Sequence, residues 1–159
     1  MAKTTIVDRD RGWKSLMRKI TDLVSQRREL VVGVTSDRYV DGNSVAEIAM
    51  IHEFGTATVP QRSFIRSTLD KHGLTYSKQL AEGVQAAIVD AVNGKLDTDQ
   101  KALNRLGMRI KGDIQKRIAQ GISPPNAPAT IARKGSSTPL IDSGQLRASI
   151  TYELRKGGR

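Results

Sequence analysis

Length and composition limit what this chain can be. Its 159 residues suffice for one domain with its own core, and 26 Lys and Arg against 16 Asp and Glu leave a formal charge of +10. The absence of cysteine excludes a disulfide framework and a thiolate metal site. No apolar run reaches bilayer-spanning length and no signal peptide is recognisable, so we expect synthesis in a reducing cytoplasm and no membrane partner.

The charge and the apolar content both point to partners. A balance this basic favours contact with a polyanion, most often nucleic acid; the alternative is solubility together with pairing to acidic neighbours. Hydrophobic residues make up 38% of the chain and aromatic residues 4%, which predicts a small, mainly aliphatic core. Such a chain is expected to need a partner in order to bury enough surface.

An amphipathic helix is predicted from Gly12 to Arg28. Apolar residues recur there at steps of three and four, the spacing of one helix face. This stripe consists of Trp13, Leu16, Met17, Ile20, Leu23 and Val24. We expect it to pack in the core or at a subunit interface, and we expect residues 1–10 to be flexible.

A short strand and an elbow come next. Leu30 to Thr35 is rich in β-branched residues and is predicted to be a strand. A helix begins near Ala46 and ends at Gly55, since glycine readily takes the left-handed conformation. The chain is then extended before Pro60, and Ser63 is expected to cap the following helix, with a start at Gln61 or Arg62 as the alternative. Such an elbow displays the residues between its two helices.

Two long helical regions are predicted between Ser63 and Gln120. The first runs to Asn93, with a break or kink at Gly73, and its apolar side consists of Leu80, Val84, Ala87, Ile88, Ala91 and Val92. The second begins at Asp97 or Thr98. Its buried stripe consists of Leu103, Leu106, Ile110, Ile114 and Ile118.

The C-terminal part combines a loop and a strand. Residues 121–138 contain several prolines and are predicted to form an extended loop that docks through Ile122 and Ile131. Strict alternation from Gln145 to Arg155 predicts a strand, with the Leu30–Thr35 strand as its mate. Residues 156–159 are expected to be a flexible tail. The fold class is therefore α+β: a single domain, 1–159, with a small antiparallel sheet packed against three or four helices.

Catalytic chemistry is not indicated. His52-Glu53 begins like a zinc-protease helix, but Thr56 stands where the second histidine is needed. No phosphate-binding loop or dinucleotide fingerprint is present. We therefore assign no catalytic, cofactor or metal residue and expect a protein that is not an enzyme. The enzyme alternative is kept only because the loop from Gly121 could act as a lid.

Two blocks of the sequence resemble a known family. Ile51-His52-Glu53-Phe54-Gly55-Thr56 is followed closely by Pro60-Gln61-Arg62-Ser63-Phe64-Ile65-Arg66, and Pro139-Leu140-Ile141-Asp142-Ser143-Gly144-Gln145-Leu146 with Ser149-Ile150 comes near the end. In order and rough separation these blocks resemble the tail-completion (virion morphogenesis, neck) proteins of long-tailed bacteriophages and prophages. The resemblance covers about Val31 to Leu154.

The resemblance implies a structural role in a virion. Copies would form a ring, with a hexamer as one candidate size, at the head–tail junction. The ring would complete the tail, join it to the capsid, and contact neighbouring neck, connector and tail proteins. The protein would be made in the bacterial host cytoplasm and end in the virion. A tail terminator or another neck ring component is the alternative within this class. A basic DNA-binding regulator is the alternative from another class, although no helix-turn-helix is recognisable.

Two groups of residues are candidates for contacts. The interface candidates are His52, Glu53, Phe54, Gly55, Pro60, Arg62, Phe64, Pro124, Pro125, Pro128 and Ile131. Phe54 and Phe64 are the candidate anchors, with the chain's own core as the alternative place for both. The DNA-lumen candidates are Lys101, Arg105, Arg109, Lys116, Arg133 and Lys134. Such cations either form a solvated face or line a ring and touch phosphates without reading sequence.

Overall fold

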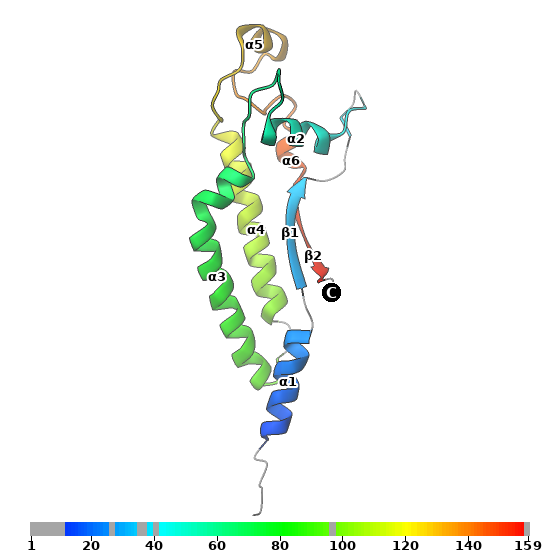
Figure 1. Ribbon diagram of the computed structural model, residues 1–159, viewed down its shortest axis with the longest axis vertical. Coiled ribbons are helices and arrows are strands. Elements are labelled where there is room, and N and C mark those ends of the chain that lie inside the picture. The colour runs from blue at the N-terminus through cyan, green and yellow to red at the C-terminus, as the bar shows by residue number, and fades with distance from the viewer. Residues whose placement is uncertain (1–11, 26–27, 35–37, 40–41, 96–97, 158–159) are drawn as a thin grey trace, which may run out of the picture.

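Helices and one small antiparallel sheet make up the protein in a computed structural model, which describes residues 12–25, 28–34, 38–39, 42–95 and 98–157. The elements are α1 (Trp13–Ser25), β1 (Arg28–Val34), α2 (Val45–Phe54), α3 (Arg66–Val92), α4 (Thr98–Ala119), α5 (Pro128–Lys134), α6 (Gln145–Ala148) and β2 (Ile150–Lys156). The predicted α+β class is confirmed, with six helices in the described residues where three or four were expected. The molecule is elongated, with α5 at one end and α1 at the other (Figure 1).

The sheet pairs two strands that are far apart in the sequence. β1 and β2 run antiparallel, as predicted, in a register that joins Arg28 to Lys156 at one end and Val34 to Ile150 at the other. α4 packs against both strands. At Gly107 an added Cβ would lie 2.7 Å from Cγ of Tyr152, so only a glycine allows α4 to come this close to the sheet. The α4 side chains Leu106, Ile110, Ile114 and Ile118 are buried as predicted, and Leu103 is half-buried.

The last strand begins later than its alternating pattern predicts. Gln145–Ala148 forms the one-turn helix α6, and β2 starts at Ile150. Gly144, at φ 80°, lets the chain turn into this helix, in which the Ala148 N–H donates to the Gly144 carbonyl at 3.0 Å. Alternation would place Ala148 on the same face as Leu146 and Ile150, and Ser149 on the other face. Because the turn is helical, Ser149 is buried instead and Ala148 is exposed. Lys156, the first residue of the predicted flexible tail, belongs to β2, so the predicted tail is shortened. Residues 1–10, which were predicted to be flexible, and residues 158 and 159 of the tail lie outside the described part.

α3 is one continuous helix. The predicted break at Gly73 is wrong, and the helix begins at Arg66 rather than Ser63. A glycine in a helix interior costs about 1 kcal/mol relative to alanine. The packing of α3 on α4 along its length offsets a penalty of that size.

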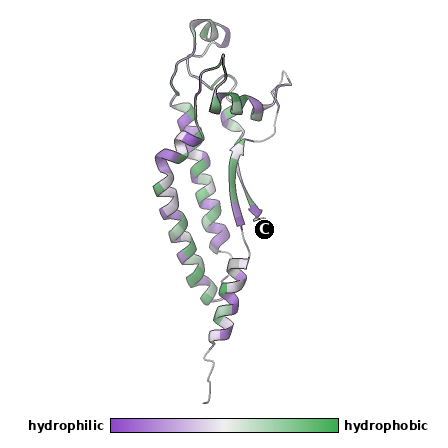
Figure 2. Cartoon of the chain, in the orientation of Figure 1, coloured by the Kyte–Doolittle hydropathy of each residue, from purple (hydrophilic) through white to green (hydrophobic). Residues whose placement is uncertain are grey.

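The apolar side of α3 is divided between the core and the surface. The face toward α4 consists of Tyr76, Gly83, Ala87 and Ala91, which are buried. An added Cβ on Gly83 would lie 2.6 Å from Cβ of Ala102, so small residues bring these helices close together. Leu80, Val84, Ile88 and Val92 are 40–50% exposed, although the sequence predicted them as one apolar side with the buried alanines. Figure 2 shows hydrophobic residues running along α3.

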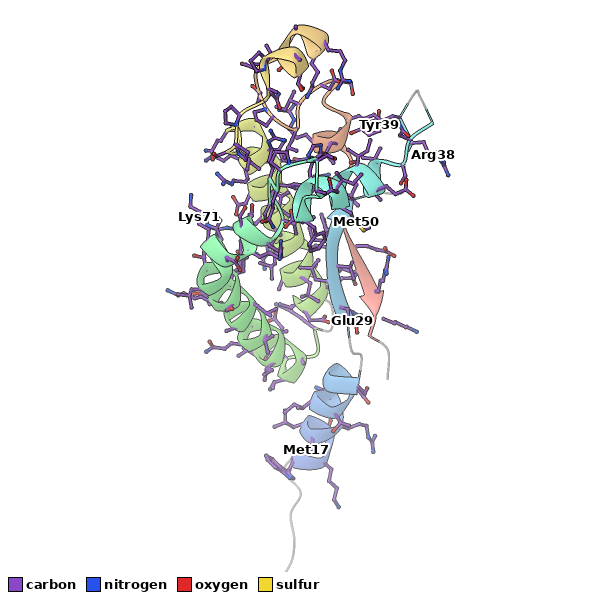
Figure 3. The ribbon with its side chains drawn as sticks, turned by 45° about the horizontal axis from the view of Figure 1, so that its top comes forward. Met17, Glu29, Arg38, Tyr39, Met50 and Lys71 are labelled. Atoms are coloured by element: carbon purple, nitrogen blue, oxygen red, sulfur yellow. The ribbon has the colours of Figure 1, made fainter. Side chains whose placement is uncertain are left out.

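α1 extends away from the rest of the molecule. It ends at Ser25, and its contacts are with α3, where Lys19 Nζ donates to the Val92 carbonyl at 3.3 Å. Trp13 is 64% exposed and Met17 is 41% exposed, so a place for them in the core is wrong and an interface remains the prediction. Met17 lies at the end of the molecule opposite Tyr39 (Figure 3).

The segment 121–138 is more ordered than predicted. Within it Pro128–Lys134 forms α5, with proline in the first turn, and Gly135 ends the helix at φ 67°. Ile122 is buried and Ile131 is half-buried, which agrees with the predicted docking. The expectation of one extended loop is therefore replaced by two short connections that flank a helix.

Candidate functional site

A buried carboxylate organises the elbow between α2 and α3. Glu53, near the end of α2, is 4% exposed, and its Oε2 accepts hydrogen bonds from the N–H groups of Phe64 (2.8 Å) and Ile65 (2.9 Å). Its Oε1 accepts from the Ser63 hydroxyl at 2.7 Å and the Arg66 N–H at 3.0 Å. The first N–H groups of a helix have no partner within the helix, and a negative charge is favoured at that end. Glu53 therefore caps α3 from the preceding helix.

The environment of Glu53 favours its charged form. Burial alone would raise the pKa of Glu53, because it disfavours the charged carboxylate. The hydrogen bonds from Ile65, Ser63, Arg66 and Phe64 outweigh burial, and the pKa lies below its ordinary value. Ser63, the predicted cap, acts as one donor to this carboxylate and also accepts from the Ser67 N–H at 3.2 Å.

The arm between the helices is held closed by its own backbone. Gly55 ends α2 at φ 75°, and a Cβ added there would lie 3.0 Å from the Gln61 nitrogen. Thr56 N–H donates to the Val59 carbonyl at 2.8 Å, and Arg62 N–H donates to the His52 carbonyl at 2.7 Å. The arm is thus a tight reversal that brings Arg62 back beside the end of α2.

Arg62 joins the elbow to the proline-rich segment. Its side chain is only 7% exposed, and its Nε donates to the Pro124 carbonyl at 2.7 Å while Nη2 donates to the Pro125 carbonyl at 2.9 Å. Two parallel bonds from a guanidinium fix both distance and orientation. Because Pro124 and Pro125 are anchored this way, the chain that leads into α5 is held beside the elbow.

The second sequence block packs against the first. Leu140, Leu146 and Ile150 are buried in the same hydrophobic cluster as Val45 and Phe64. Leu140 has a positive φ of 65°, an uncommon conformation for a bulky side chain. The Gln145 amide donates to the Arg38 carbonyl at 2.7 Å, which ties α6 to the segment before α2.

These elements enclose a cleft of about 810 Å³, here called the elbow cleft. Its apolar lining, here called the floor, includes Ile48, Val59, Pro60, Leu140 and Leu146. Its polar lining includes Tyr39, His52, Arg62, Asn126, Arg133, Lys134 and Asp142. A volume of this order is within the range of ligand-binding pockets, about 300–1,000 Å³.

His52 is the titratable ring in the elbow cleft. Burial first, and then the charges of Arg62 and Lys134, lower the pKa of His52 and favour the neutral imidazole. Its Nδ1 is buried and has no hydrogen-bond partner within the described residues. Arg62 and Lys134 therefore place positive charge near the ring and oppose its protonation.

The interface candidates divide into three groups. His52, Pro60, Arg62, Pro124 and Pro125 line the elbow cleft, and Pro128 and Ile131 lie on α5 beside it. Phe64 is fully buried in the chain's own core, so it is not a surface anchor. Glu53 caps α3 and Gly55 ends α2, so both residues serve the elbow itself.

Phe54 is 61% exposed and lies outside the cleft. The Arg66 guanidinium sits 4.8 Å from its ring centroid. Phe54 therefore remains a candidate anchor.

The DNA-lumen candidates do not form one row. Lys101, Arg105, Arg109 and Lys116 are exposed along α4, and Arg109 lies 3.9 Å from the Asp113 carboxylate. Arg133 and Lys134 are on α5, at the elbow cleft. Sequence reasoning missed Tyr39, Asn126 and Leu140 as lining residues, because only the tertiary fold brings them beside the elbow.

Neither a metal site nor a membrane span emerges from the described ranges. Within them no three His, Asp or Glu side chains come together in a group suited to a metal ion. Within the same ranges, no helix combines the length and the apolar character needed to cross a bilayer.

Comparison with protein-family models, with curated proteins and with solved structures finds no match for this chain. The resemblance to tail-completion proteins therefore depends on the two sequence blocks alone.

Proposed function

We propose that the chain is a structural protein of a bacteriophage or prophage particle. In this proposal, copies form a ring at the head–tail neck that completes the tail, joins it to the capsid and surrounds the DNA path. Its place is the virion, after synthesis in the host cytoplasm. The protein acts by assembly and not by catalysis.

The proposal depends on the two sequence blocks that resemble tail-completion proteins. They are far apart in the chain, yet their residues build one structural unit. Glu53 and Arg62 of the first block hold α3 and the proline-rich segment, and Leu140 and Leu146 of the second block complete the same cluster and the same cleft. A chance match between two short patterns would not be expected to fall on residues with a common structural task.

Exposed apolar surface supports assembly. Among the described residues, the large hydrophobic side chains that are exposed are as numerous as the hydrophobic side chains, alanine included, that form the buried core. Leu80, Val84 and Ile88 lie four residues apart on the outside of α3, and Ala81 and Val89 extend this open apolar face, which the polar residues Ser77 and Gln85 also line. A contiguous exposed apolar area commonly marks an interaction site. A ring of identical copies would sum such weak contacts by closure.

The exposed cations fit a ring that surrounds DNA. Lys101, Arg105 and Lys116 on α4 are exposed, and contacts of this kind with phosphates carry no sequence information. Weak, non-specific and salt-sensitive binding of duplex DNA is the expected behaviour. A strong preference for one duplex sequence would favour a regulator.

The test compares two variants of α3 with equal charge change. Val84→Glu places a carboxylate on the exposed apolar face, and Thr75→Glu places one on the opposite side of the same helix. Sedimentation velocity should show loss of the ring in Val84→Glu alone, while circular dichroism and the unfolding midpoint of both stay near those of the unmodified protein. A ring unaffected by Val84→Glu would exclude this face as the contact. A fixed dimer that binds a particular duplex would overturn the proposal.

A further inference from the structure

The wall of the elbow cleft is cationic. Arg62, Arg133 and Lys134 line it, whereas Asp142 is the carboxylate residue among its lining residues. His52 also lines the cleft, and burial first, then the charges of the same Arg62 and Lys134, lower its pKa. A ligand that carries a negative charge would be attracted to this wall.

The floor of the cleft has a different character. Ile48, Val59, Pro60, Leu140 and Leu146 line it, and Leu140 and Leu146 are themselves buried in the core. Apolar floors beneath a few placed polar groups are typical of sites that bury side chains. A nucleic-acid backbone would leave such a floor uncovered, because its contacts are mainly with phosphates.

The cleft is also held in shape before any ligand arrives. Arg62 anchors the Pro124 and Pro125 carbonyls, and Glu53 fixes the junction of α2 and α3. Gly135 then ends α5, so that Arg133 and Lys134 sit in its last turn. A site that is already ordered loses less entropy on binding.

We propose that the elbow cleft receives an extended segment of a neighbouring polypeptide that presents apolar side chains and at least one Asp or Glu side chain. The apolar side chains cover the floor, and the carboxylate lies against Arg133 and Lys134. This inference rests on the proposed neck role, because it names the chemistry of the neighbour that the elbow meets. The net charge of +10 gives the chain as a whole the same preference for acidic neighbours.

The first experiment identifies the preferred ligand with a displayed library of random 12-residue peptides and the full chain as bait. Enriched peptides should combine Asp or Glu with apolar residues. The cleft variant is Arg133→Glu with Lys134→Glu, and the matched control is Lys14→Glu with Arg18→Glu, at exposed positions on α1, which makes the same change in net charge. Acidic enrichment should disappear with the cleft variant and persist with the control.

The second experiment locates the bound peptide. The chain has two histidines, His52 in the cleft and His72, which lies elsewhere, beside Lys71 and Lys116. In a proton–nitrogen NMR titration, the best selected peptide should shift the imidazole signals of His52 and leave those of His72 unchanged. Its counterpart with Asn and Gln in place of Asp and Glu should bind at least about tenfold more weakly.

Three results would overturn the inference. Equal acidic enrichment with both charge-reversed variants would mean general attraction to a basic protein. Shifts at His72 instead of His52 would place the ligand elsewhere. Duplex DNA that shifts His52 and displaces the peptide would make nucleic acid the occupant. The solution mass of the unmodified protein is measured separately, so a failure of the ring and a failure of this contact remain distinguishable.

Discussion

Replacing Glu53 by glutamine tests the cap that joins α2 to α3. The substitution keeps the shape of the side chain, but one of its two oxygens becomes an NH₂ group. Whichever way the amide turns, this group faces two donors: the N–H groups of Phe64 and Ile65, or the Ser63 hydroxyl and the Arg66 N–H. A buried donor without an acceptor costs about 1–3 kcal/mol, and loss of a cap costs about 0.5–2 kcal/mol. We expect a loss of roughly 2–4 kcal/mol in the free energy of unfolding.

Urea unfolding followed by circular dichroism measures this loss. Glu82→Gln, at an exposed position in the middle of α3, is the matched control and should change the free energy of unfolding by less than about 0.5 kcal/mol. The folded-state pKa of Glu53 is lowered, so its stabilisation is present above the ordinary glutamate pKa and is lost as the pH falls through the folded value. The difference between Glu53→Gln and the unmodified protein should therefore shrink in acid. A cost equal to that of Glu82→Gln, or one that does not vary with pH, would refute the reasoning.

Two further predictions concern packing and the proline-rich segment. Gly107→Ala should lower the free energy of unfolding in urea by about 1–3 kcal/mol, because its Cβ meets Tyr152. Gly112→Ala on the same helix has open space, so it should be neutral or stabilising by up to about 1 kcal/mol. Equal effects of the two variants would contradict the close approach of α4 to the sheet. In Arg62→Lys a single ammonium group replaces the two fixed donors that bind the Pro124 and Pro125 carbonyls. Amide hydrogen exchange and proteolysis should therefore accelerate across residues 121–135, with Arg105→Lys as the control. Unchanged protection in Arg62→Lys would mean that other contacts hold this segment.

Local periodicity explains what could be predicted from the sequence. The stripe Leu106, Ile110, Ile114 and Ile118 was identified correctly because its spacing is helical and its whole face is buried. The pairing of β1 with β2 followed from there being two runs with strand character. The helix α5 was missed although Pro128 and Gly135 stand at the first-turn and C-terminal positions where these residues are favoured.

Tertiary contacts explain what could not be predicted. Periodicity finds the apolar side of α3 but does not say that α4 covers Ala87 and Ala91 and leaves Val84 and Ile88 exposed. The cap by Glu53 was missed because its acceptor comes from the end of the previous helix, and local cap rules consider residues such as Ser63. The elbow cleft combines segments from Tyr39 to Leu146, which no local pattern brings together.

The solution mass of the unmodified protein, measured by light scattering across a range of concentrations and with tail tubes added, tests the central claim most directly. The proposed neck role predicts a discrete ring, or a monomer that becomes a ring at high concentration or on tail tubes. A particle that stays a monomer or a fixed dimer under all these conditions would contradict it.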